Sequence, residues 1–209
     1  MVGILEDERD GCGLHFPEAG LEVVLLGETS DELGGSEWQQ LFLPDALAAP
    51  PHVDLDREKA LIELLLAMHG DHMLRSAHDV SNGGLAVALA ECSAYGVGCE
   101  VELAGHADAL DAIAILFSES QGRAVVTCAA EHLETLLGLA GNHDVPARRI
   151  GRTKDDSFTI TRNRVPLIST TTAELARIWR PAFAMLLGGD TIDDVVRGVG
   201  EAAPEIVAH

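Results

Sequence analysis

The chain has 209 residues, of which 47% are hydrophobic and 23% are charged, so it can bury the core of one domain. Its 34 acidic and 14 basic residues give a formal net charge of −20, which disfavours nucleic acid and anionic membrane surfaces as partners. Its apolar runs are interrupted well before the roughly 20 residues that a membrane-spanning helix needs.

The N-terminal residues and the cysteines indicate the compartment. The sequence begins without a basic leader and without a small-residue cleavage site, which predicts a cytoplasmic protein with no secretory signal. The four cysteines are scattered without C-x-x-C spacing, so a disulfide scaffold is disfavoured and reduced thiols are expected.

The first half of the chain alternates between short apolar runs and helical patterns. A buried strand is expected at 21–26, followed by a helix that begins at Glu37 and by an irregular, proline-containing connection. The next helix, at 55–69, is expected to bury one face formed by Leu61, Ile62, Leu65 and Leu66. A strand at 73–80, a glycine turn and a helix at 85–93 come next.

In the second half, strands are expected at 97–103, 123–129, 147–153 and 157–162. Helices are expected at 108–116, 131–139 and 172–187. This order, with some strands adjacent in sequence, predicts an α/β or α+β fold in which a mixed β-sheet is flanked by helices. We expect one domain over residues 1–188 and a loosely attached tail over 189–209.

A glycine turn precedes the helix at Glu37. Gly34, Gly35 and Ser36 could present backbone N–H groups and a hydroxyl to an anion such as phosphate. The alternative is a turn that needs positive φ, closed by an ordinary serine N-cap. The spacing leaves both interpretations open.

A second candidate site lies where the expected strand at 73–80 ends. His78 and Asp79 come just before Gly83 and Gly84, which open the next helix, and ligands often bind at this edge of layered α/β folds. The Asp79 carboxylate could bind Mg²⁺, which prefers oxygen ligands. In the alternative interpretation Asp79 caps the turn and His78 packs against the fold.

A third polar segment lies between two segments that are expected to be buried. Glu119, Ser120 and Gln121 supply hydrogen-bonding groups suited to hydroxyl or amide recognition. The alternative is an ordinary surface loop. No nucleophile elbow, P-loop or dinucleotide-binding motif is present in the sequence.

Taken together, the three motifs occur in the order and rough spacing of one protein family, in segments 26–37, 76–91 and 116–121. From about Val2 to Leu187, the chain resembles the C-terminal part of phosphoribosylformylglycinamidine synthase, the ATP-dependent, glutamine-using ligase of purine biosynthesis. That family belongs to the aminoimidazole ribonucleotide synthetase superfamily, and its large subunit contains two tandem pairs of A and B domains. The motifs are similar to those of the second B domain, which implies a fold like the C-terminal domain of the synthetase.

The resemblance also implies what the chain lacks. Both A domains, which carry the catalytic histidine and most of the metal carboxylates, lie outside it, so no catalytic residue is expected here. ATP and Mg²⁺ would serve the full enzyme, with no cofactor in this fragment. The implied partners are the missing A and B domains, a glutaminase subunit or domain, and a possible second copy of the chain through an exposed apolar patch.

The resemblance further implies roles for single residues. Asp79 matches a metal-binding aspartate of the first B domain, and Glu119–Gln121 match its substrate-binding residues. In the second copy this cleft is an auxiliary or degenerate nucleotide site, so we expect Asp79 to mark a vestigial metal site. Two hypotheses follow: the chain is a piece of the ligase that is inactive alone, or it is a non-catalytic scaffold that organises A domains or partner subunits.

Overall fold

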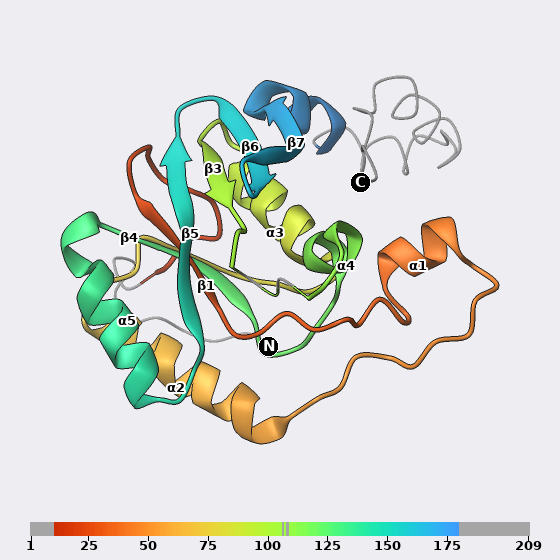
Figure 1. The fold of residues 1–209 in the computed structure, drawn as a ribbon. Helices are drawn as coiled ribbons and strands as arrows, with labels where there is room; N and C mark the ends of the chain where they lie inside the picture. Colours follow the sequence, from red (N-terminus) through yellow and green to blue (C-terminus); the bar gives the residue numbers. More distant parts are fainter. Residues whose placement is uncertain (1–10, 106, 108, 180–209) are drawn as a thin grey trace.

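The computed structural model describes residues 11–105, 107 and 109–179 (Figure 1). The strands are β1 (Glu22–Leu26), β2 (Ser76–Asp79), β3 (Gly98–Glu102), β4 (Ala124–Cys128), β5 (Ala147–Lys154), β6 (Ser157–Arg162) and β7 (Val165–Thr171). The helices are α1 (Glu37–Phe42), α2 (Leu55–Gly70), α3 (Gly84–Ser93), α4 (Ala112–Phe117) and α5 (Leu133–Asn142), with a 3₁₀ turn, η2 (Ala130–His132), before α5. Residues 172–179 are also helical.

The seven strands form one mixed sheet. Their order is β2-β4-β1-β5-β3-β6-β7, and the β3–β6 pair is parallel whereas the other neighbours are antiparallel. The sheet with its flanking helices confirms the expected fold class. Strand β1, with all five residues buried, lies inside the sheet between β4 and β5.

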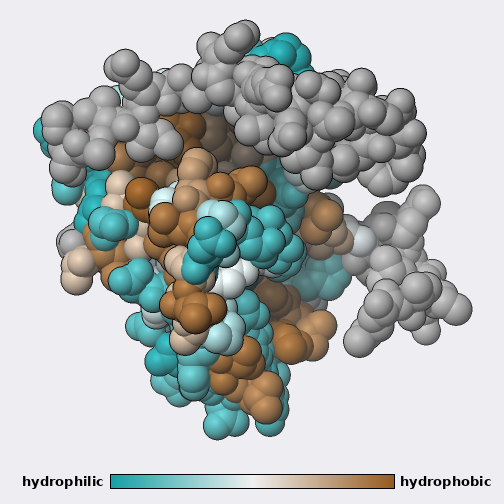
Figure 2. Space-filling model, turned by 90° about the vertical axis from the view of Figure 1, so that its right-hand side faces the viewer, coloured by the Kyte–Doolittle hydropathy of each residue, from teal (hydrophilic) through white to brown (hydrophobic). Residues whose placement is uncertain are grey.

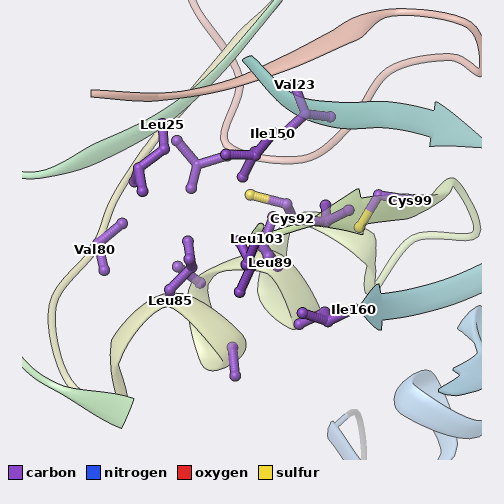
Figure 3. Close-up of a cluster of buried hydrophobic side chains, with 14 of the residues drawn as sticks. Val23, Leu25, Val80, Leu85, Leu89, Cys92, Cys99, Leu103, Ile150 and Ile160 are labelled. Atoms are coloured by element: carbon purple, nitrogen blue, oxygen red, sulfur yellow. The ribbon is translucent and has the colours of Figure 1, made fainter. Parts of the chain in front are cut away.

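Two hydrophobic clusters lie on opposite faces of the sheet. Because side chains alternate along β1, Val23 and Leu25 belong to one cluster and Val24 and Leu26 to the other. Figure 3 shows the first cluster, in which leucines of α3 approach the sheet residues Val23, Leu25 and Ile150. The second cluster is covered by α2 and α5, which lie side by side on the other face (Figure 1).

The buried face of α2 differs from the expected one. Leu61, Leu64 and Met68 are buried, whereas Ile62 and Leu66 are exposed, so the prediction was wrong for those two residues. The helix rests on the second cluster through a narrow stripe spaced three and four residues apart. The two neighbouring pairs, Leu61–Ile62 and Leu65–Leu66, therefore overstated the width of the contact.

Strand β7 was not predicted. It pairs with β6 alone, at the edge of the sheet, where Pro166 is tolerated because an edge strand leaves some N–H groups unpaired. Asn163 and Arg164 connect the two strands with φ angles of 52° and 65°, the positive values that a tight hairpin turn requires. A sequence signal for this hairpin was thus present in the asparagine of the turn.

Other element boundaries moved by a few residues. The strand expected at 73–80 forms over Ser76–Asp79, and α4 begins at Ala112 because the Asp111 carboxylate accepts a hydrogen bond from the Ala114 N–H at 2.7 Å. The expected helix at 172–187 is described only as far as residue 179. The tail at 189–209 lies outside the described residues, so the domain division stays a prediction.

The described residues also bear on membrane-spanning helices and on disulfide bonds. They contain no helix that is both long and apolar enough to cross a bilayer. The thiols of Cys12, Cys92, Cys99 and Cys128 are all free. Burial raises the pKa of Cys92 and Cys99, the latter to about 12, so these thiols pack as small apolar groups.

Candidate functional site

The three sequence motifs meet at the side chain of Glu119. One carboxylate oxygen, Oε1, accepts hydrogen bonds from the N–H of Glu37 and from the N–H of Gly83, both at 2.8 Å. Glu37 is the first residue of α1 and Gly83 is the N-cap of α3, so the carboxylate joins the starts of two helices. A negative group at helix N-termini is electrostatically favourable. We call this arrangement the Glu119 junction.

The first glycine turn is closed internally. The Ser36 hydroxyl is buried, accepts from the Gln39 N–H at 3.1 Å and donates to the Leu33 carbonyl at 2.6 Å, so Ser36 is the N-cap of α1. Gly35, with φ of 73°, donates its N–H to Gln39 Oε1 at 2.6 Å. These contacts correspond to the capping interpretation, because the amides of residues 35 and 37 are already satisfied.

Close packing explains Gly34. A Cβ at this position would overlap with the carbonyl group of Ala49, so the returning chain lies directly against the glycine. Gly34 therefore seats the connection between α1 and α2 on the turn. Packing therefore requires a residue without a side chain at this position.

The second glycine turn packs against the segment before Glu119. Gly83 and Gly84 have φ angles of 78° and 70°, which favour glycine. A Cβ on Gly84 would lie 2.7 Å from the Ser118 carbonyl oxygen and 2.8 Å from that of Leu116. The glycines thus let α3 start in close contact with the end of α4.

The segment around Glu119 is tied to the loop at residues 30–32. Ser120 Oγ accepts from the Ser30 N–H at 3.0 Å, and the Glu119 N–H donates to the Glu32 carbonyl at 3.2 Å. Ser120 is buried, whereas the Gln121 side chain is exposed and donates to the Glu119 carbonyl at 2.9 Å. Of the three residues, only Gln121 therefore fits the surface-loop alternative.

Arg123 supports the same segment, and its role was missed from the sequence. The guanidinium is buried and donates to the carbonyls of Ser118 at 2.6 Å and Ser120 at 2.8 Å, and to the Thr29 hydroxyl at 3.0 Å. Burial lowers its pKa to about 10, an effect that Glu32 and Glu119 oppose. The one signal was a charged residue at the start of an apolar strand. All three guanidinium nitrogens thus donate hydrogen bonds within the fold, and this arrangement does not favour binding of a phosphate.

His78 and Asp79 lie at the end of β2 and face different surroundings. His78 is nearly buried, with Nδ1 2.7 Å from the Asp79 carbonyl oxygen and Nε2 3.4 Å from the Glu91 carboxylate. Burial raises the pKa of Glu91, and His78 opposes that rise. The Asp79 side chain is 72% exposed. Within the part of the chain that the structure describes, no three histidine, cysteine or acidic side chains converge on a metal position.

A magnesium ion therefore does not fit the donor set that the described residues offer at Asp79. Mg²⁺ binds through carboxylates plus phosphate oxygens in near-octahedral geometry. Asp79 offers a single exposed carboxylate, and Glu119 uses Oε1 for two backbone amides. Any metal held at Asp79 would need oxygen ligands from outside the described residues.

A hollow of about 390 Å³ brings part of the predicted site together. His78, Asp79 and Gln121 line it, together with residues of α2 and β4. A neighbouring cavity of about 220 Å³ is lined by Glu28, Glu32, Asp54 and Glu58 around one guanidinium, that of Arg57, which pairs with Glu28 at 2.9 Å. The second cavity is acidic, so it disfavours a free anion. Arg57 was not singled out from the sequence.

Comparisons with known proteins place this geometry in a family. The family model described as AIR synthase related protein, C-terminal domain, matches residues 18–162. The PurL subunit of phosphoribosylformylglycinamidine synthase from Thermobifida fusca is 42% identical over 190 residues, which make up 90% of this chain and 24% of that relative. The chain thus spans about a quarter of the length of this relative.

Solved structures agree on the fold. PurL from Thermotoga maritima complexed with FGAR superposes with a TM-score of 0.73 at 21% identity, covering 81% of this chain and 30% of that one. Structures of that PurL complexed with ATP and of PurLQS give TM-scores of 0.67 and 0.65 at 20% identity, each covering 81% of this chain and 28% of the other. With the family model matching more than half of the sequence, the chain belongs to the AIR synthase related proteins, as a C-terminal domain of that family.

Proposed function

We propose that the chain supplies the last B-type domain of a phosphoribosylformylglycinamidine synthase. This enzyme uses ATP to activate the glycinamide carbonyl oxygen of formylglycinamide ribonucleotide and replaces that oxygen with nitrogen from glutamine, so that the amide becomes an amidine and the formyl group is kept. The observation that carries the proposal is the 42% identity to a PurL subunit over 90% of the chain. The TM-score of 0.73 to a PurL structure supports the fold alone.

The chain contributes no catalytic group of its own in this proposal. Gly34, Gly35 and Ser36 form a capped turn, and Glu119 occupies the amides of Glu37 and Gly83. ATP and Mg²⁺ act elsewhere in the enzyme, and the fragment alone holds neither. His78, Asp79, Ser120 and Gln121 then mark a vestigial cleft that keeps the family's residues for structural reasons.

The partners follow from the missing part of the enzyme. We propose that the domain works with the remaining A and B domains and with a glutaminase subunit, in the cytoplasm and without nucleic acid. PurLQS from Thermotoga maritima is an assembly of such a PurL with further subunits, as its name states. A homodimer of the chain through an exposed apolar surface is the alternative partnership.

A second candidate function is a scaffold that organises other domains without touching substrate. The Glu119 junction favours it, since the carboxylate that could bind substrate is used within the fold. The two candidates agree for the whole enzyme and differ only in whether ligands contact this domain.

The test replaces the matching quarter of the Thermobifida fusca subunit with this chain. We expect the isolated chain to show no turnover of formylglycinamide ribonucleotide with ATP and ammonia, and the chimera to recover turnover. In the chimera, Asp79→Asn should leave turnover unchanged if the domain is a scaffold, and Glu174→Gln on an exposed helix provides the matched control. Turnover by the isolated chain, or a folded chimera without activity, would overturn the proposal.

A further inference from the structure

The connection between β1 and α2 carries an apolar surface that the fold leaves bare. Helix α1 has no buried residue, and every residue from Gln40 to Pro50 is exposed. Leu41, Phe42 and Leu43 are at least half exposed and Leu47 is fully exposed. We call these four leucine and phenylalanine side chains the tip surface. The side of the molecule that carries α1 faces the viewer in Figure 2, where brown side chains gather between teal ones.

The tip surface is held in a fixed form from below. Gln39 Nε2 donates to the Ala46 carbonyl, the His52 N–H donates to Glu32 Oε1 at 2.8 Å, and Ala49 lies against Gly34. A helix of six residues is not stable in water through its own hydrogen bonds. These polar contacts at the base therefore keep α1 folded while its apolar side chains point away from the core.

Apolar patches of this kind mark interaction sites on soluble proteins. The negative charge around the tip surface indicates the kind of partner that it can bind. Residues 36–56 contain four carboxylates and no lysine or arginine. A second copy of the chain, itself at −20, would bring like charges together at the same patch. An apolar groove with a basic rim is the complementary surface.

The length of the relatives indicates where that groove lies. The chain matches 24% of the Thermobifida fusca subunit, so about three quarters of such an enzyme lies outside the match. We infer that the tip surface docks into an apolar, basic-rimmed groove on another domain of the same synthase. This inference rests on the proposed function and assigns the docking to particular residues.

Amide hydrogen exchange in two proteins tests the inference. In the isolated chain, the amides of Leu41–Leu43, whose hydrogen bonds lie within the short helix α1, should exchange through local opening and much faster than those of α5. In the intact Thermobifida fusca subunit, the amides at the aligned positions should exchange at least about 10-fold more slowly, because docking must be broken before they open. Helix α5, which packs on the second hydrophobic cluster, should exchange alike in both proteins and serves as the internal control.

Variants separate docking from local folding. In the intact relative, aspartate at the positions aligned with Leu41 and Phe42 should remove the extra protection. Aspartate at the positions aligned with Ile62 and Leu66, which are exposed on α2, should not. In the isolated chain, the Leu41→Asp, Phe42→Asp variant should sediment like the parent and melt close to it, since both side chains are more than half exposed and only the ring contact of Phe42 with Trp38 is lost.

Three results would overturn the inference. One is equal exchange of α1 in the isolated chain and the intact relative. Another is protection in the relative that both pairs of aspartate variants remove equally. The third is a dimer of the isolated chain that the tip variant dissociates, which would make a second copy the occupant. None of these results depends on turnover by the chimera, so failure of the docking inference is distinguishable from failure of the proposed function.

Discussion

The base and the tip of the connection between Gly34 and His52 differ in which side chains they expose. The base is polar and internally hydrogen-bonded, whereas the tip is apolar and exposed. At the base, the Ser36 hydroxyl and the Glu119 carboxylate form hydrogen bonds with backbone groups of the turn and of α1, so these polar groups already have partners inside the domain. At the tip, apolar side chains lie in water with little packing below them. Ser36 and Glu119, which suggest ligand binding, thus act within the fold, whereas the apolar side chains of the tip surface are left exposed.

The largest loss of stability at the base is expected from a substitution of Arg123. Replacing it with methionine removes three hydrogen bonds and leaves the buried carbonyls of Ser118 and Ser120 without a donor. We expect Arg123→Met to lower the free energy of unfolding by about 3–5 kcal/mol, measured by urea denaturation. Arg177→Met, at an exposed ion pair, is the matched control and should change it by no more than about 0.5 kcal/mol. A loss below about 1 kcal/mol for Arg123→Met would contradict the role given to it.

Adjacent glycines of the turn should respond differently to alanine. At Gly34 the new Cβ would overlap with Ala49 and displace the returning chain, for an expected loss of about 2–3 kcal/mol in chemical denaturation. At Gly35 the space is open and only the φ of 73° is strained, for a loss of about 1 kcal/mol. Equal losses at the two positions would argue against close packing of the connection on Gly34.

Two variants of Glu119 distinguish the contribution of its negative charge from that of its hydrogen bonds. Glu119→Ala leaves the N–H groups of Glu37 and Gly83 without their acceptor, and we expect a loss of about 2 kcal/mol. Glu119→Gln keeps a carbonyl oxygen that can accept both bonds, so it should lose about 1 kcal/mol or less. Thermal unfolding followed by circular dichroism gives both values. A glutamine variant as unstable as the alanine variant would show that the negative charge, rather than the acceptor, matters.

A smaller effect is expected at Glu22, a carboxylate buried under two arginines of β5. Burial raises its pKa, but hydrogen bonds and charges from Arg152 and Arg149 outweigh burial, so the net pKa lies below its ordinary value. The stabilisation is therefore complete above the unfolded-state pKa of about 4.3 and is lost as pH falls through the folded-state value. Urea midpoints between pH 7 and pH 3 should fall less in Glu22→Gln than in the parent. Parallel pH curves for the two proteins would count against this assignment.

The sequence predicted the parts of the fold that depend on local pattern. The strand at 21–26, the Ser36 N-cap and the helix after Gly84 follow from apolar spacing and capping chemistry, and they are confirmed. Strand β7 was missed because it gains its hydrogen bonds from β6 alone, and its pattern carries a proline. Edge pairing of this kind depends on the neighbour rather than on the segment itself.

The sequence predicted which residues come together at the candidate site, but it did not predict what their side chains contact. The order of the motifs was enough to associate Glu119 with both glycine turns through resemblance, and the structure brings them within hydrogen-bonding distance. That the carboxylate would accept backbone amides, and that Arg123 would turn inward beneath it, depends on long-range packing. Neither spacing nor composition encodes the direction of a side chain.

The central claim is that the motif residues hold this domain together and that nucleotide chemistry needs the rest of the enzyme. Isothermal titration calorimetry of Mg-ATP, and separately of inorganic phosphate, into the isolated chain tests it most directly. We predict no saturable heat up to about 1 mM of either ligand, for the parent and for Asp79→Asn alike. Saturable Mg-ATP binding with a Kd below about 0.1 mM that Asp79→Asn abolishes would contradict the claim and restore a working nucleotide site.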